Sequence, residues 1–179
     1  MSLDGDGERG EDVIMTDPAF PAAAFAPAER ITLQATPLAV IREEGLRVAD
    51  LGAVFDRGYT AIGGLFQSGE LVPTGPALAI YHGDPMGEFD LELGFPVTVA
   101  PAAPIVRGDV VVRASQLPAG PAFATTHIGP YDGLGAAWGE LAGAADGTPT
   151  GVWIESYVGE PGSTAPEELR TDLILPVRD

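Results

Sequence analysis

The sequence of 179 residues contains no cysteine, no lysine and only two histidines, His82 and His127. Without cysteine there are no disulfides, thiolate nucleophiles or sulfur-ligated zinc sites, and an intracellular protein is favoured. The two separated histidines show no HExxH spacing, so they indicate no zinc site. A P-loop, a dinucleotide fingerprint and a serine-hydrolase elbow are also missing. We therefore expect neither a metal nor a cofactor.

Positive charge is scarce as well. Nine arginines oppose 26 acidic residues, which gives a formal net charge of -17. Such a surface repels phosphate backbones and anionic lipid, so we expect neither direct nucleic-acid binding nor membrane binding. The acidity is typical of a highly soluble protein, although it could also attract cationic ligands. No apolar run could span a membrane, and the acidic start does not resemble a signal peptide, so we expect a cytoplasmic protein. The oligomeric state stays open.

The chain divides into a short arm and one domain. Residues 1–29 are acidic and then rich in alanine and proline, which predicts a flexible arm that is too short for a helix-turn-helix domain. Residues 30–179 are predicted to form one α+β domain. Its patterns indicate a strand over 31–41, a helix over 46–66 and strands over 77–82 and 89–99. A short extended piece at 110–112, a strand over 123–128, a helix over 131–145 and strands over 152–158 and 173–177 follow.

This order repeats, and so do some of the residues. Tyr81-His82-Gly83-Asp84-Pro85 aligns with Tyr157-Val158-Gly159-Glu160-Pro161 at a shift of 76 (157 minus 81). Leu93-Gly94-Phe95-Pro96-Val97 aligns with Leu173-Ile174-Leu175-Pro176-Val177 at a shift of 80 (173 minus 93). The sequence therefore predicts two structural repeats, over about 30–100 and 110–179.

The strand over 152–158 holds the most informative residues. Its alternation places Trp153, Glu155 and Tyr157 on one face, whereas the first repeat has alanine at the positions that match Trp153 and Glu155. A carboxylate between two aromatic rings suits a pocket floor better than a core, because an unpaired buried charge is costly. A plainer interpretation stays open, in which Glu155 faces water on an open sheet.

At His127-Ile128-Gly129-Pro130-Tyr131-Asp132-Gly133-Leu134, Trp138-Gly139-Glu140-Leu141 and Gly151 to Val158, the chain resembles the GyrI-like small-molecule-binding family. The segments around Tyr81 and Phe89 and the closing residues 169–177 fit the family too. This family comprises effector-binding domains of AraC-type and MerR-type multidrug-responsive regulators, and the chain looks like a stand-alone member. The resemblance implies duplicated βαββ units whose antiparallel sheets form a concave ligand groove with helices packed behind.

The resemblance also implies that Glu155 lies in the groove as the carboxylate that meets cationic aromatic ligands. We expect Trp153, Tyr157, Tyr131 and Tyr81 to line the groove with it. Trp138, His127 and Glu92 are further candidates for ligand binding. Four of these candidates also have another interpretation: Tyr131 could hold its turn, Trp138 fits a helix core, His127 fits a structural hydrogen bond, and Glu92 could face water.

Three functions follow from these expectations. The first is a stand-alone binding protein for hydrophobic, aromatic and often cationic small molecules such as drugs or secondary metabolites. The second is a hydrolase of reactive cyclopropane-bearing metabolites, as some stand-alone members of the family are, with Glu155 as general acid or base. The third is a gyrase-inhibitor-like protein-interaction module.

Overall fold

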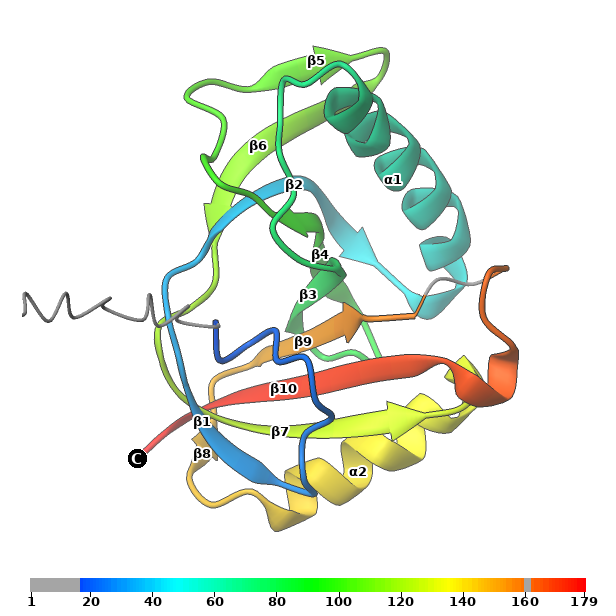
Figure 1. Cartoon of the computed structure of the whole chain (residues 1–179). Coiled ribbons are helices and arrows are strands. Elements are labelled where there is room, and N and C mark those ends of the chain that lie inside the picture. The colour runs from blue at the N-terminus through cyan, green and yellow to red at the C-terminus, as the bar shows by residue number, and fades with distance from the viewer. Residues whose placement is uncertain (1–16, 160–161) are drawn as a thin grey trace, which may run out of the picture.

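Within residues 17–159 and 162–179, which the computed structural model describes, ten strands form one curved antiparallel sheet flanked by two helices (Figure 1). The first repeat contains β2 (Pro37–Leu46), α1 (Leu51–Gln67), β3 (Ala77–Gly83) and β4 (Phe89–Pro96). The second contains β7 (Gly120–Ile128), α2 (Leu134–Ala144), β9 (Val152–Tyr157) and β10 (Arg170–Arg178). The remaining strands are β1 (Glu29–Leu33), β5 (Ile105–Arg107), β6 (Val110–Gln116) and β8 (Thr148–Pro149). Three short 3-10 turns are Val48–Asp50, Tyr131–Gly133 and Pro166–Glu168.

The strand register confirms the repeat that the sequence predicts. The sheet runs β1-β7-β10-β9-β3-β4-β2-β6-β5, so β9 and β3 join the two βαββ units at its centre. Leu78 of β3 pairs with Gly94 of β4, and Ile154 of β9 pairs with Ile174 of β10, which reproduces the shifts of 76 (154 minus 78) and 80 (174 minus 94).

A pseudo-two-fold axis passes between β3 and β9. Tyr81 pairs with Trp153 and Ala77 pairs with Tyr157, so each pair maps onto the other under the shift of 76. Ala79 pairs with Glu155, its own counterpart in the second repeat. Glu155 therefore stands at the centre of the sheet, beside the axis that relates the two units.

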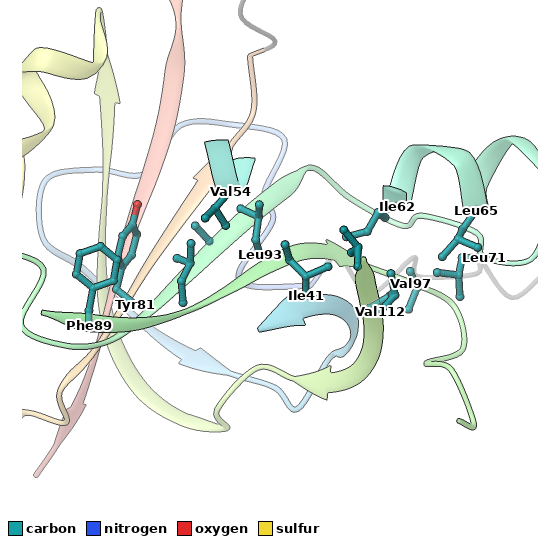
Figure 2. Packing of buried hydrophobic residues seen from close by; sticks show 14 residues of the cluster. Ile41, Val54, Ile62, Leu65, Leu71, Tyr81, Phe89, Leu93, Val97 and Val112 are labelled. Carbon is teal, nitrogen blue, oxygen red and sulfur yellow. The ribbon is translucent and has the colours of Figure 1, made fainter. Parts of the chain in front are cut away.

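Both helices lie on the face of the sheet that carries Glu155. The buried positions Val54, Gly58, Ile62 and Leu65 of α1 follow helical spacing and pack on β2 and β4, as Figure 2 shows for Val54, Ile62 and Leu65. Gly58 permits this close approach, because a Cβ atom there would lie 2.5 Å from Ile41 Cδ1 and 2.9 Å from Leu93 Cδ2. On the second unit, α2 packs through Leu141, Trp138 and neighbouring residues onto β7 and β10. The two helices thus border the central strands from opposite halves (Figure 1).

The opposite face of the sheet is covered by residues 17–28, where we expected a flexible arm. Ala19 and Phe25 are buried in an apolar cluster with Leu78 and Ile174. The Phe25 amide donates a hydrogen bond to Thr126 Oγ1 (2.8 Å), and the Arg170 guanidinium donates to the carbonyls of residues 21–23. The expectation of flexibility is therefore wrong for residues 17–28, which Arg170 and apolar contacts hold against the sheet. Residues 1–16 lie outside the described residues.

Candidate functional site

Glu155 lies in the middle of β9 and is 8% exposed. The phenol of Tyr157 donates a hydrogen bond to its Oε2 (2.6 Å), and the phenol of Tyr81 makes a longer one to the same oxygen (3.4 Å). The indole Nε1 of Trp138 donates to Oε1 (3.0 Å). Because tryptophan only donates, Oε1 must act as an acceptor. In the described part of the chain no arginine or histidine forms an ion pair with Glu155, so its partners are neutral.

These phenols stay protonated at neutral pH. Burial, and after it the negative charge of Glu155, raises the pKa of Tyr81, Tyr131 and Tyr157 above the ordinary value of 10.0. Burial also raises the pKa of Tyr59. A protonated phenol can donate to a carboxylate, whereas a phenolate would repel it. The site therefore presents a single negative charge inside a neutral aromatic shell.

Aromatic side chains from both units complete that shell. The rings of Tyr131 and Tyr157 meet edge to face (centroids 6.1 Å apart), as do those of Trp138 and Trp153 (5.2 Å). Phe55 of α1 meets Tyr157 in the same way (6.0 Å) and stacks on Tyr59 (5.8 Å). Of the four tyrosines and two tryptophans in the chain, three bond Glu155 directly. Tyr131 and Trp153 contact those rings, and Tyr59 lies one ring further away, behind Phe55.

Phe55 and Tyr59 were not predicted to lie at the site. Their spacing of four residues on α1 was a usable signal, since it places both rings on one helical stripe with Phe66. That stripe also fits a plain core, and Tyr59 does contact Phe95 (5.6 Å) on β4. The spacing does not predict which end of this stripe lies near Glu155.

Trp138 and Trp153 differ in how they are held. Trp138, for which the sequence favoured a core position, packs partly in the core of the second unit and also bonds Glu155. The indole of Trp153 donates to the carbonyl of Gly83 (3.1 Å), at the end of β3. The Trp153 hydrogen bond ties the two repeats together across the central strand pair.

His127 lies on the same face but serves the turn before α2. Its Nε2 atom lies 2.9 Å from the Pro130 carbonyl oxygen, so this nitrogen carries a proton and donates. A Cβ atom at Gly133 would come within 2.7 Å of His127 Cε1, so the glycine leaves room for the imidazole. His127 therefore supports the turn that carries Tyr131, which is 40% exposed at the rim of the site.

Glu92 does not join the site. It pairs with Ile80 and Arg42 and lies on the opposite face of the sheet, where His82 Nε2 (2.7 Å) and Ser115 Oγ (2.5 Å) bond its carboxylate. Burial raises the pKa of Glu92, but the hydrogen bonds from His82 and Ser115 outweigh it and leave the pKa below the ordinary value. The expectation that Glu92 could face the groove is therefore wrong. Strand alternation shows that neighbouring residues face opposite ways, but it does not show which face carries the site.

A separate hollow of about 480 Å³ lies near the end of β10, between Pro121, Val152 and Arg178. None of the rings around Glu155 lines it, and the charged groups that do line it, Arg178 and Asp179, are exposed. We place the candidate site at Glu155, because that is where a buried charge and specific donors converge. The described residues contain no cluster of three potential metal ligands, and none of their helices could cross a membrane.

Comparison with known proteins agrees with this architecture. The C-terminal domain of EcmrR superposes with a TM-score of 0.66 at 20% identity, covering 84% of this chain and 96% of that one. SAV2435 bound to tetraphenylphosphonium gives 0.62 at 12% identity, covering 86% and 94%. A hydrolase from Listeria innocua gives 0.59 at 16% identity, covering 88% and 94%. At these identities the likeness shows the fold alone.

No curated protein matches the sequence. The family model for the GyrI-like small molecule binding domain matches residues 29–178. That match spans most of the chain and agrees with the duplicated βαββ sheet. The chain therefore belongs to the GyrI-like small molecule binding domain family.

Proposed function

We propose that this protein binds hydrophobic small molecules at Glu155 and that aromatic cations are its favoured ligands. The observation that carries the proposal is the convergence of Tyr81, Tyr157 and Trp138, with further aromatic rings packed against them, on one buried carboxylate whose partners are neutral. Aromatic rings offer flat apolar contact area, and they also attract cations to their faces.

The electrostatics favour a cation over a neutral ligand of the same shape. Three neutral donors stabilise the Glu155 carboxylate without cancelling its charge. A cation that replaces water near Glu155 gains Coulomb energy in a poorly hydrated place, and each ring face adds about 0.5–2 kcal/mol. SAV2435, a fold neighbour, has tetraphenylphosphonium bound, and this aromatic cation has the chemistry that the site would accept.

A matched pair of ligands tests the proposal. N-methylacridinium and acridine share one ring system, but at slightly alkaline pH only the first carries a charge. Titration of the fluorescence of Trp138 and Trp153, which flank Glu155, should show tighter binding of the cation. Equal affinities, or no binding of either compound, would exclude a site built around the Glu155 charge.

The Tyr157–Glu155 hydrogen bond of 2.6 Å favours hydrolysis as a second candidate function. The carboxylate could take a proton from a water molecule while the water oxygen attacks an electrophilic ring carbon. As the ring bond breaks, the phenol of Tyr157 could give its proton to the released ring atom, and the protonated Glu155 could then restore the phenol across their shared hydrogen bond. Incubation with a cyclopropane-bearing electrophile, followed by mass spectrometry, should show addition of one water if this function is real. An unchanged substrate would leave binding as the function.

A further inference from the structure

Two buried hydroxyl groups find no hydrogen-bond partner among the described residues. They are Thr171 Oγ1 on β10 and Ser156 Oγ on β9, and both residues are 0% exposed. Buried polar groups in folded proteins nearly always have a partner, because an unpaired one loses its hydration without compensation. Each of these hydroxyls therefore needs an explanation.

Their positions on the sheet separate them. Thr171 pairs with Tyr157 on one side and with His127 on the other, so its side chain shares their face. Ser156 lies between Glu155 and Tyr157 in sequence and pairs with Leu78 and Asp172, so it points to the opposite face. Only Thr171 lies on the same side as Glu155.

Thr171 stands directly beside the aromatic shell. Side chains paired across antiparallel strands have Cβ atoms about 5 Å apart, so the side chain of Thr171 neighbours that of Tyr157. Tyr131 contacts the Tyr157 ring from the turn that His127 holds. Because Tyr157 lies two residues from Glu155 on β9, Thr171 is also the diagonal cross-strand neighbour of Glu155, with Cβ atoms about 7–8 Å apart.

We propose that Thr171 is a specificity-determining residue whose hydroxyl hydrogen-bonds a polar substituent of the ligand. The inference rests on the proposed function and narrows its ligand class. The favoured ligands are aromatic cations that also carry a hydroxyl, amino or carbonyl group, rather than purely hydrocarbon cations. Glu155 supplies the countercharge, and Thr171 on the neighbouring strand β10 hydrogen-bonds the polar substituent of the ligand.

Tetraphenylphosphonium and its analogues with one ortho, meta or para hydroxyl on a phenyl ring provide the test. Their affinities for the full chain are measured by calorimetry, and the readout is the ratio of affinity between the best hydroxylated analogue and the parent. One neutral hydrogen bond predicts a ratio of about three to ten in the wild type. In Thr171→Val the ratio should fall to about one, and in Thr171→Ser, which keeps the hydroxyl, it should be retained.

Ser156→Ala is the matched control, because it removes the other unpaired buried hydroxyl from the opposite face and should leave the ratio as in the wild type. Thermal unfolding checks folding, and Thr171→Val should melt no lower than the wild type, because no protein partner is lost. A wild-type ratio near one, or a ratio that survives in Thr171→Val, would overturn the role of Thr171 while leaving cation binding intact. If the protein binds none of the phosphonium ions, the proposed function and this inference both fail.

Discussion

Replacement of Glu155 by glutamine removes one negative charge and keeps nearly the same side-chain shape. The residue is 8% exposed, so water screens the charge poorly. A unit charge about 4 Å away in a medium of effective dielectric constant about 20 interacts by roughly 4 kcal/mol. The three hydrogen bonds to the carboxylate and the cost of dehydrating the cation reduce this. We expect a net loss of about 1.4–2.8 kcal/mol, which is about ten- to a hundredfold in affinity for N-methylacridinium.

The assay is calorimetric titration with N-methylacridinium and with acridine, using the wild type, Glu155→Gln and Glu92→Gln. Glu92→Gln changes the net charge of -17 by the same single unit, but on the opposite face of the sheet. Only Glu155→Gln should lose affinity for the cation, and its affinity for acridine should change little. An equal loss in both variants would mean that the overall acidity attracts the cation, and an equal loss for both ligands would mean that Glu155 only supports the fold.

Three further predictions concern the scaffold. Gly58→Ala should lower the free energy of unfolding, measured in urea, by about 1–3 kcal/mol, because its Cβ would overlap Ile41 and Leu93. Gly64→Ala, whose Cβ meets open space, should be neutral or stabilising by up to about 1 kcal/mol. Equal effects of the two substitutions would refute the close approach of α1. Because the folded-state pKa of Glu92 is lowered, its contribution to stability should be present above the unfolded pKa and lost as the pH falls through the folded pKa. The free energy of unfolding should therefore fall less steeply from neutral to acidic pH for Glu92→Gln than for the wild type. Parallel pH dependences would exclude the effect. Arg170→Met should lower the free energy of unfolding by about 3 kcal/mol or more, since Asp172 would stay buried without its cation. Arg30→Met should lower it by under about 1 kcal/mol, because the pair of Arg30 with Asp179 is exposed. Similar losses for the two variants in chemical denaturation would contradict this difference.

The strands, the repeat and the central carboxylate could be predicted because each depends on local pattern. Alternation along β9 gave the shared face of Trp153, Glu155 and Tyr157, and internal similarity gave the register shifts. The sequence left Tyr131 open between a site role and a turn and favoured the core for Trp138, whereas the structure places Tyr131 against Tyr157 and bonds Trp138 to Glu155.

The missed features depend on contacts between distant segments. Alternation showed that Glu92 and Leu93 face opposite ways, but only the packing of α1 decides which face carries the site. Tyr59 reaches the site because Gly58 lets α1 approach the sheet closely. Residues 17–28 lack periodicity, and the side chain that holds them, Arg170, lies 147 to 149 residues away along the chain.

Because Arg170 holds residues 21–23, the folded unit begins before residue 29, where the match to the family begins. A chain truncated to the matched range, residues 29–178, would lack Phe25 and the carbonyl oxygens that surround the Arg170 guanidinium. It would uncover a hydrophobic patch around Leu78, Ile80 and Ile174, and such a patch favours self-association. Recombinant versions should therefore keep residues 17–28, in which Asp17 also accepts a hydrogen bond from Thr36 in the connection between β1 and β2.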